Sequence, residues 1–560
     1  MPLGEPPTRL KTDEVLQTRF RNEFMKVAPH WETAGTRQVV VNPTPLIDLT
    51  KEVVECAKNI HDLDLSALRL KVLGKLESAM PGGSIKTRAA LCIINDAIDS
   101  GRLRRGQVVF EATSGNFGIA LGLVGRLGFK VFALVSRELR PGVLAELKKS
   151  GVKLVDLDIE ICPAPGLMSG RGDARWGSEG DASAGRASTA TLGGSESIEA
   201  TIMGVRQQLA LGGLDPTVFD RSVKDAEKLL RRQDAIGLAK LLAKAYGGFC
   251  PEQYDNELNA KAHELLTGPE IDQQLADHYG SSLEGFELVS TFGTGGTSSG
   301  LLRYMRNTYG RGSVHVVFPQ EGQDVAGIRT KVKAAGLRFY TPAEYAGQHE
   351  VDFEQAKRTL GYFVRKGYDI GESSALALFA VMQMAKAVGG GNYVIILADG
   401  MEKYQTDKEG SVPFAEKRVE VEVQDAASVS REYAKVVWAH PVFSLSSEGT
   451  QLIASSLGVD ASLVSIAEAG EVERFYFGDD ALPPGIARLA RDIGSRKLLL
   501  VCTTGSTSRK LAQLLLARGI SAESLKGGIA ELSRGKGADG GGTRAMSELL
   551  EPATSQRASS

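Results

Sequence analysis

A single lysine follows a tight glycine turn at residues 81–88, where the chain reads PGGSIKTR. The turn comes shortly after the apolar run Leu70–Leu73, and a long helical pattern follows it. One lysine at the start of a helix is ordinarily a solvated surface charge. An amine fixed on a rigid element can instead bond to a carbonyl compound and move a proton. Lys86 is therefore the first candidate for chemistry.

A glycine-rich loop with hydroxyl side chains follows at residues 111–118, EATSGNFG, between an expected strand and an apolar helix. Its free backbone N–H groups and the hydroxyls of Thr113 and Ser114 suit a carboxylate. The side chain of Asn116 could add a hydrogen bond to a ring hydroxyl. Taken alone, the loop is explained as well by an ordinary Thr or Ser helix cap with a glycine turn.

A third loop, GTGGT, also lies between a strand and a helix pattern and consists of Gly293, Thr294, Gly295, Gly296 and Thr297. Such a loop lets backbone amides wrap a phosphate at a helix N-terminus. It lacks the lysine of a P-loop and the spacing of a Rossmann dinucleotide loop. An amine, a carboxylate loop and a phosphate loop in this order predict a pyridoxal phosphate site, with Lys86 as the Schiff-base partner.

Short β-rich runs alternate with amphipathic stretches over most of the chain. Strands are expected at Val108–Thr113, Lys130–Val135, Phe286–Thr291, Ser313–Phe318 and Tyr393–Leu397, and helices at Ile119–Leu127, Ser299–Asn307 and Ser222–Tyr246. Strands separated by helices indicate βαβ units and a mostly parallel sheet with helices on both faces. The fold class is therefore α/β.

The composition is that of an ordinary soluble protein, with 42% hydrophobic and 24% charged residues in a chain of 560. A net charge of −2 gives no electrostatic reason to expect nucleic acid or an anionic membrane as a partner. The five cysteines are scattered without metal-ligand pairs, and the first residues contain no apolar signal segment. These observations predict a cytoplasmic protein without a bound metal.

The length predicts about two to four domains. The expected divisions are an N-terminal extension (1–37), a catalytic domain (38–415), a C-terminal domain (425–533) and a disordered tail (534–560). The catalytic domain carries an inserted module at about 166–235 that begins with a Gly-, Ser- and Ala-rich stretch. This module could be a lid, a partner-docking surface or a tolerated surface insertion.

Six stretches carry a family resemblance: GGSIKTRAA, EATSGNFGIALG, QYDNELNAKAHELLTGPEI, STFGTGGTSSGLLRYMR, GESSALAL and VIILADGMEKY, in this order over about residues 40–410. The chain resembles the fold-type II pyridoxal phosphate family of cysteine synthases and cystathionine β-synthases. The resemblance implies two parallel-sheet αβα subdomains and a homodimer. It also implies that Lys86 bonds to the cofactor, that Asn116 and Gly293–Thr297 hold it, and that the substrate carboxylate is bound by Thr113, Ser114, Gly115, Asn116 and the nearby Gln253.

Two positions depart from the family pattern, and a third bears on which substrate the protein uses. Phe117 stands where the family usually has threonine, which changes the carboxylate contact. The family places a serine or threonine at the pyridine nitrogen, and the aligned place here is Asp399, or Gly400 if the loop slips by one. Arg329 stands where relatives that use O-phosphoserine have arginine, and a guanidinium suits a phosphate. A surface arginine on a mobile loop is the alternative.

The C-terminal region has its own candidate in Cys502, which follows the apolar strand Lys497–Val501 and precedes a helix expected at Arg509–Gly519. Backbone N–H groups and the helix dipole there favour a thiolate or persulfide, and the sharp turn is expected to expose the thiol. An inert buried cysteine is the ordinary alternative. The stretch VCTTGSTSRKLAQLLLARGI, followed by SLKGGIAEL, resembles a rhodanese domain.

The resemblance implies β-replacement on an O-activated L-serine, O-phosphoserine or O-acetylserine, by a sulfur nucleophile to form cysteine or a related amino acid. Cys502 would then carry persulfide sulfur to or from the site. Three alternatives stay open: β-elimination by a cysteine desulfhydrase, β-replacement with a nitrogen nucleophile or cyanide, and a non-catalytic scaffold that retains the fold.

Overall fold

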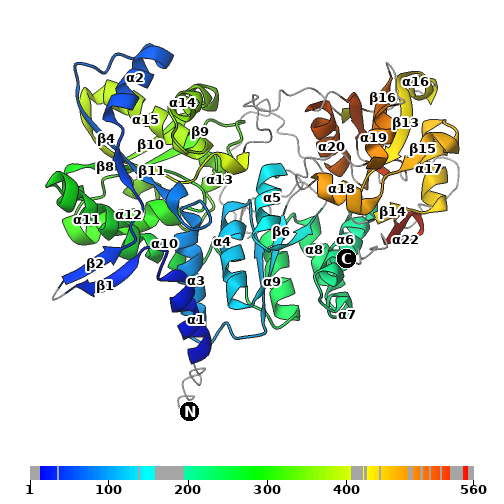
Figure 1. The fold of residues 1–560 in the computed structure, drawn as a ribbon, viewed down its shortest axis with the longest axis horizontal. Coiled ribbons are helices and arrows are strands. Elements are labelled where there is room, and N and C mark those ends of the chain that lie inside the picture. The colour runs from blue at the N-terminus through cyan, green and yellow to red at the C-terminus, as the bar shows by residue number, and fades with distance from the viewer. Residues whose placement is uncertain are drawn as a thin grey trace, which may run out of the picture.

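The computed structural model describes residues 13–34, 37–135, 139, 141–157, 195–404, 420–421, 426–440, 443–476, 484–491, 496–503, 506–517, 520–526, 528–529, 532 and 546–552. Figure 1 shows two α/β bodies, one formed by the elements up to residue 404 and the other by the C-terminal strands and helices that follow. The predicted residues 166–194 of the inserted module lie outside the described residues.

The largest sheet has six strands in the order β10-β9-β8-β11-β4-β3. Only β3 is antiparallel to its neighbour. The strands span Gly347–Val351, Val314–Pro319, Glu287–Thr291, Gly390–Leu397, Arg69–Leu76 and Leu46–Asp48 in that order. Side chains alternate between its faces, so that Val72 and Ile395 pack in one cluster while Leu73 and Val394 pack in another.

Helices cover both faces of this sheet (Figure 1). The Val72 face is covered by α2 (Thr50–His61), α14 (Phe353–Arg365) and α15 (Glu372–Val388). The opposite face is covered by α11 (Gly268–Tyr279) and α12 (Gly296–Tyr309). The expected strands β8, β9 and β11 and the helix α12 are confirmed, with ends that differ by up to three residues from the sequence prediction.

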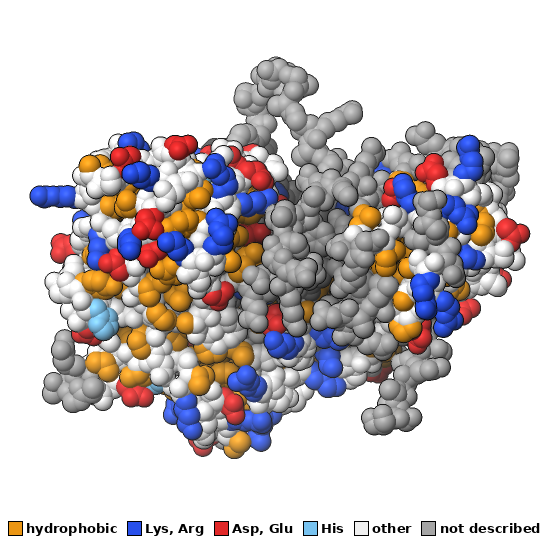
Figure 2. Space-filling model, turned by 45° about the horizontal axis from the view of Figure 1, so that its top comes forward, with side chains coloured by type: hydrophobic (Ala, Val, Ile, Leu, Met, Phe, Trp, Pro, Cys, Tyr) orange, Lys and Arg blue, Asp and Glu red, His pale blue; other side chains and the backbone are white. Residues whose placement is uncertain are grey.

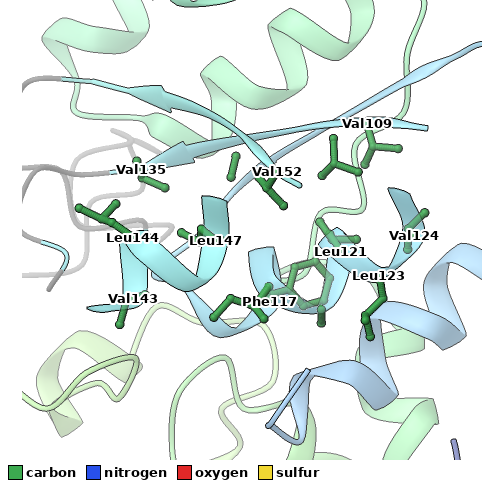
Figure 3. Close-up of a cluster of buried hydrophobic side chains, with 14 of the residues drawn as sticks. Val109, Phe117, Leu121, Leu123, Val124, Val135, Val143, Leu144, Leu147 and Val152 are labelled. Carbon is green, nitrogen blue, oxygen red and sulfur yellow. The ribbon is translucent and has the colours of Figure 1, made fainter. Parts of the chain in front are cut away.

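A second sheet consists of three parallel strands, β5 (Val108–Ala112), β6 (Lys130–Val135) and β7 (Lys153–Asp156). One face packs against α4 (Asn116–Val124) and α5 (Pro141–Lys149), where Val109, Val135 and Leu144 meet Phe117 and Leu121 (Figure 3). The other face buries Phe110 and Phe132 beneath later helices. The two parallel sheets are the two subdomains that the resemblance implies.

The inserted module contributes buried helices rather than a surface decoration. Ile198, Val205 and Leu209 of α6 (Ser195–Leu211) are buried in the core that contains Phe132. The helical pattern predicted at Ser222–Tyr246 is confirmed as two helices, α8 (Val223–Arg231) and α9 (Ala235–Ala245), which are separated at Gln233, whose φ is +55°. For α6, the burial of these side chains contradicts the interpretation as a tolerated surface insertion.

The C-terminal domain contains a five-stranded parallel sheet in the order β12-β17-β16-β13-β15. Its strands are Glu420–Val421, Ala522–Leu525, Lys497–Val501, Tyr433–Trp438 and Val464–Ile466 in that order. The helices include α16 (Ala426–Glu432), α17 (Ser447–Leu457), α18 (Ala469–Tyr476), α19 (Pro484–Arg491) and α20 (Ser506–Ala517). Helix α20 begins three residues earlier than the sequence predicts.

Part of the expected tail is ordered, so the prediction of disorder over 534–560 is wrong for residues 546–552. Here α22 (Met546–Leu549) leads into β18 (Leu550–Pro552), which pairs antiparallel with β14 (Phe443–Leu445). Leu549 and Leu550 are buried against the C-terminal core. A glycine-rich stretch precedes this short apolar run in the sequence and led to the prediction of disorder, although Leu549 and Leu550 pack in the core.

Helix α6 also joins the two bodies. Its Ala200 is buried in the cluster that contains Trp438 and Phe443 of the C-terminal domain, and Met203 packs against the same cluster. Helix α6 therefore has one side in the catalytic domain and one side on the C-terminal domain. A second apolar cluster also spans both, since it contains Leu144 of α5 and Leu511 of α20.

The N-terminal extension packs onto the catalytic domain through α1 (Glu14–Phe24) and the hairpin β1 (His30–Ala34) and β2 (Arg37–Val41). Phe20 and Phe24 are buried beside α3 (Lys86–Asp99). The visible surface in Figure 2 mixes positive and negative side chains, in keeping with the small net charge. Among the described helices, none is both long and apolar enough to span a bilayer.

A buried ionic network fixes the position of α3. Arg88 Nε donates to Glu77 Oε2 at 2.7 Å, and Arg88 Nη1 donates to Glu270 Oε2 at 2.6 Å. Lys75 of β4 binds the same Glu270 on α11, and all four side chains are fully buried. Two positive and two negative charges balance, which avoids the large cost of an unpaired buried charge. The network therefore holds β4, α3 and α11 together.

Candidate active site

One pocket between the two sheets brings together most of the residues singled out from the sequence. Lys86, Ser114, Asn116, Gln253, Gly293, Thr294, Gly295, Thr297 and Asp399 all line it. Each loop lies where a parallel strand ends and a helix begins, after β4, β5, β8 and β11. Ligand sites of open α/β sheets form at these carboxyl ends. Thr113, Gly115, Gly296 and Arg329 are not among the lining residues.

Lys86 is the first residue of α3 and lines this pocket, where it is partly buried. Its Nζ donates to Thr294 Oγ1 at 3.4 Å, so the amine reaches the predicted phosphate loop. Burial lowers the pKa of Lys86 to about 8, and the positive charge of Arg329 adds to this while Asp399 opposes it. A lysine with this pKa has a much larger neutral fraction near physiological pH than an ordinary lysine, and the neutral amine is the form that attacks a carbonyl and accepts a proton.

The predicted carboxylate loop begins α4, and Gly115 at its N-cap has φ +127°. A Cβ on Gly115 would approach Val143 Cγ1 to 2.4 Å, so both conformation and space require glycine. Thr113 has a different place from the one expected. Its Oγ1 accepts hydrogen bonds from the N–H groups of Gly115 and Gly118, each at 3.1 Å. Thr113 therefore shapes the loop, while Ser114 and Asn116 face the pocket.

Phe117 contributes to both the pocket and the core. It lines the pocket beside Asn116, and it also packs among the apolar side chains of α4 and α5 (Figure 3). A threonine hydroxyl at this point would add a polar contact, whereas Phe117 supplies an apolar wall. The departure from the family pattern therefore removes a hydrogen-bonding group from the pocket.

Glycine is also required in the predicted phosphate loop. Gly295 has φ +86°, and a Cβ there would meet Phe292 at 2.5 Å. A Cβ on Gly296 would lie 2.2 Å from Asn259 Oδ1. Removing these Cβ atoms lets the backbone bend closely at the N-terminus of the 14-residue helix α12, where N–H groups favour an anion.

Two buried side chains that the sequence analysis missed support this loop. Asn259 Nδ2 donates to Thr294 Oγ1 at 3.0 Å, and His263 Nε2 lies 3.2 Å from Thr297 Oγ1. Burial, with help from Arg88 and Lys86, holds the pKa of His263 well below its usual range, so its imidazole is neutral. His263 opens a π-helical segment, His263–Thr267, before α11. Both residues lie in the family stretch QYDNELNAKAHELLTGPEI, but of that stretch only Gln253 was assigned to the site.

Asp399 follows β11 and is held by three groups. Its Oδ2 accepts from Asn116 Nδ2 at 2.7 Å and from the Tyr404 hydroxyl at 2.6 Å, and Lys403 Nζ lies 3.1 Å away. Burial and the Asp399 carboxylate raise the pKa of Tyr404 well above its usual range, so this hydroxyl remains a donor. The carboxylate thus fixes Asn116, and its role at a pyridine nitrogen stays a prediction.

The family has a serine or threonine at the pyridine nitrogen, and in this protein serine side chains near the pocket lie on α15 rather than after β11. Ser373, at the start of α15, lines the pocket together with Asp399. Ser374 Oγ is buried and makes no hydrogen bond within the described part of the chain. The family stretch GESSALAL contains both serines, but the sequence analysis assigned the place at the pyridine nitrogen to Asp399 or Gly400 instead.

Arg329 is buried, with 6% of its surface exposed, rather than lying free on a mobile loop. Its Nη2 donates to the Tyr254 hydroxyl at 2.9 Å. The preceding residues Gly327 and Ile328 line the pocket, as does Tyr254. The guanidinium therefore lies at the wall of the pocket, near enough to lower the pKa of Lys86.

The residues of the pocket fit pyridoxal phosphate. The Lys86 amine, whose pKa is lowered, suits the aldehyde of the cofactor. The glycine loop at the N-terminus of α12 suits its phosphate, and an unpaired polar atom suits its ring. Asn116 lines the pocket, and its Oδ1 is buried without a hydrogen-bond partner among the described residues, so it can bond to a polar edge of a ring. In the same described residues, no group of three His, Cys, Asp or Glu side chains could hold a metal ion.

The two-sheet fold and this pocket define a cofactor-dependent enzyme in which a lysine bonds to an aldehyde and a helix N-terminus holds a phosphate. Sequence comparison identifies the family. The profile of the "Pyridoxal-phosphate dependent enzyme" family matches residues 40–174 and 199–399. The chain belongs to this family, and pyridoxal phosphate is its cofactor.

Curated relatives are cysteine synthases. The chain is 24% identical over 380 residues to cysteine synthase of Staphylococcus aureus, which covers 65% of this chain and 93% of the relative. It is 28% identical over 334 residues to cysteine synthase B of Escherichia coli, covering 59% and 85%. The crystal structure of O-acetyl serine sulfhydrylase isoform 3 from Entamoeba histolytica has a TM-score of 0.44 at 20% identity, covering 74% of this chain and 96% of that one.

The acidity of Lys86 can be tested directly. Cofactor-free protein is mixed with pyridoxal phosphate at a series of pH values, and borohydride traps the covalent product for peptide mass spectrometry. We expect labelling of Lys86 to rise with pH around a midpoint near 8, because the neutral amine is the reactive form. Lys86→Ala should give no label at this peptide, whereas Lys71→Ala, which alters a surface pair with Asp48, should label normally. A midpoint near 10 would contradict the assignment.

Proposed function

We propose that the protein replaces the β-substituent of an O-activated L-serine by a sulfur nucleophile, forming cysteine or a related β-substituted alanine. The observation that carries this proposal is the meeting of Lys86, the 113–116 loop and the 293–297 loop around one pocket. The cysteine synthase relatives support the choice of reaction.

In this proposal, the start of α4 binds the substrate and Lys86 transfers the proton. The N–H groups at the start of α4, with Ser114 and Asn116, bind the substrate carboxylate. Lys86 Nζ accepts the proton from the substrate α-carbon and later returns it. Bound pyridoxal phosphate supplies the electron sink for this proton transfer. The β-substituent leaves with its bonding electron pair, and the sulfur nucleophile then forms the new bond to the β-carbon.

Arg329 supports an anionic leaving group. Its guanidinium is buried, bonds to the Tyr254 hydroxyl and lies behind the pocket residues Gly327 and Ile328. Guanidinium groups bind phosphate by paired, charge-assisted hydrogen bonds. We therefore place O-phosphoserine ahead of O-acetylserine as the donor.

The donor can be identified by visible absorbance and turnover. O-phosphoserine, O-acetylserine and cysteine are added separately to the holoenzyme, and the band shift and the product formed with sulfide are recorded. We expect O-phosphoserine to be used best, and Arg329→Leu to lower kcat/KM for this donor by about thirtyfold while changing that for O-acetylserine little. Arg338→Leu removes an exposed arginine that pairs with Glu257 and should have no such effect.

Other outcomes distinguish the alternatives. Sulfide release from cysteine without a second substrate would indicate β-elimination instead. The absence of any absorbance band with added pyridoxal phosphate would show that the catalytic domain is a scaffold.

We also propose that residues 425–533 form a rhodanese-like domain in which Cys502 carries sulfur. Cys502 follows β16 and precedes α20, and its Sγ accepts from the N–H of Ser508 at 3.4 Å and from the Ser508 hydroxyl at 3.3 Å. Such donors stabilise a thiolate or persulfide. The expectation of an exposed thiol is wrong, since Cys502 is 0% exposed within the core of β16 and its neighbours. In a reducing cytoplasm, where we place this protein, the thiol stays free.

The sulfur-carrier role predicts a selective loss. The Cys502 thiolate would take the outer sulfur of thiosulfate as a persulfide and release sulfite. Two equivalents of an added thiol would then reduce this persulfide to the Cys502 thiol and sulfide, forming a disulfide, and the sulfide would enter the β-replacement. Cys502→Ser should abolish turnover supported by thiosulfate and spare turnover supported by sulfide. Cys92→Ser, which changes a thiol on α3, serves as the control. Equal turnover with both sulfur sources in Cys502→Ser would reject the coupling.

The protein is further proposed to form a homodimer through an apolar groove of about 400 Å³ beside α1 and α3, which Phe20, Phe24, Leu91 and Leu265 help to line. Leu265 is 59% exposed and Trp31 is 39% exposed at this groove, which is unusual for large apolar side chains. Sedimentation equilibrium should give twice the chain mass, and Leu265→Lys should shift it to the monomer. A monomeric wild type would rule the dimer out.

A further inference from the structure

Glu111 is a buried carboxyl that the proposed reaction does not use. It lies on β5, two residues before Thr113, and is 1% exposed. Its Oε2 accepts a hydrogen bond from the backbone N–H of Glu252 at 2.8 Å, and the N–H of Gln253 also bonds to this carboxyl. The side chain therefore contacts the turn that carries a pocket residue.

This turn has backbone support on its carbonyl side, where Glu252 O accepts from the N–H groups of Asp255 and Asn256 at 2.9 Å each, whereas the N–H groups of Glu252 and Gln253 bond to Glu111. Phe249 still pairs with β5, since its N–H donates to Val108 O at 2.8 Å and its carbonyl accepts from Phe110 at 2.9 Å. Pro251 then has no N–H to donate, and Glu252 adopts φ +57°, an unfavourable value for a residue with a side chain. Beyond Phe249, the carboxyl of Glu111 replaces the hydrogen bonds that a strand would have supplied.

The turn leads directly to both halves of the pocket. Gln253 lines the pocket, and its Nε2 donates to Ala112 O at 3.2 Å, beside the carboxylate loop. Asn259 Nδ2 donates to Gln253 O at 2.7 Å and to Thr294 Oγ1 at 3.0 Å, in the phosphate loop. A displacement of residues 252–253 would therefore alter the carboxylate side and the phosphate side together.

We propose that Glu111 is a positioning residue for substrate binding, which holds the 251–253 turn so that Gln253 faces the amino-acid substrate. Glu111 itself touches no substrate. The substrate-binding part of this proposal rests on the proposed function, whereas the bracing of the turn does not.

The protonation of Glu111 fits this role. Burial, with a smaller contribution from Glu252, raises the pKa of Glu111 to about 8, although the two backbone N–H groups and Lys240 on α9 oppose the rise. Cys250 is the other titratable group beside it, and burial together with Glu111 raises the pKa of that thiol well above its usual range. At neutral pH the carboxyl is thus largely protonated, and glutamine is a close mimic of it.

The first test is kinetic and uses the holoenzyme. Glu111→Leu removes the acceptor at similar volume and should raise KM for the amino-acid donor about tenfold, the loss expected for about one buried hydrogen bond, while kcat stays within about threefold. Glu111→Gln keeps an acceptor oxygen and should restore KM to within about twofold. Glu252→Gln, which alters a side chain paired with Lys240 but keeps the backbone N–H, is the control. An unchanged KM in Glu111→Leu would overturn the proposal.

The second test needs no substrate and also covers the case in which Glu111→Leu fails to fold. The native pKa of about 8 lies above the ordinary value of 4.5, so the proton stabilises the fold fully below pH 4.5 and this stability is lost as pH rises to 8. The Tm of the wild type relative to Glu111→Gln should therefore fall by about 5 °C between pH 5.5 and 8.5. A large loss of Tm in Glu111→Gln at pH 5.5, where glutamine mimics the protonated carboxyl and keeps an acceptor for the turn, would overturn the bracing role. If the wild type turns over no donor, the proposed function fails while this measurement still decides the role of Glu111.

Discussion

The position of Lys86 depends on a buried ionic network that lies next to it on the same helix. Arg88 is held by Glu77 and Glu270, and Lys75 binds the same Glu270. Removing one member of such a network leaves a buried charge uncompensated, which typically costs several kcal/mol. The strand, the turn and the two helices that supply these charges must therefore come together in one arrangement. That arrangement directs the first residue of α3 into the pocket.

The same burial gives the pocket its reactivity. Lys86 lies in a low-dielectric environment beside Arg329, so its charged form is disfavoured and its pKa falls to about 8. Asp399 opposes this shift and simultaneously holds Asn116 in the pocket. Glu111 shows the matching effect on an acid, because burial raises its pKa to about 8. Desolvation, more than any single charged neighbour, brings the pKa values of both groups close to neutral pH.

The C-terminal domain is joined to this pocket by packing as well as by chain connection. Helix α6 buries Ile198 and Leu209 in the catalytic core and Ala200 in the C-terminal core. The inserted module begins with a polar stretch in the sequence, but its helix α6 has two apolar sides, one for each domain. A fixed orientation of the two domains is a physical requirement for any transfer of sulfur between them.

The sequence by itself determined the local parts of this protein. Glycine turns between strand and helix patterns located all three pocket loops, because the backbone angles and close approaches that need glycine are set within a few residues. The alternation of β-rich and amphipathic segments likewise predicted the α/β fold class, and the family resemblance implied its two subdomains. Most expected strands and helices lie within a few residues of their predicted bounds.

Only the tertiary structure decided how distant residues meet. Asn259 and His263 support the phosphate loop from another segment, Ser373 enters the pocket from α15, and Cys502 is buried rather than exposed. These contacts join residues tens to hundreds of positions apart, and their side-chain types have no special spacing along the chain. Burial and hydrogen-bond partners are properties of the packed core, so a linear pattern does not contain them.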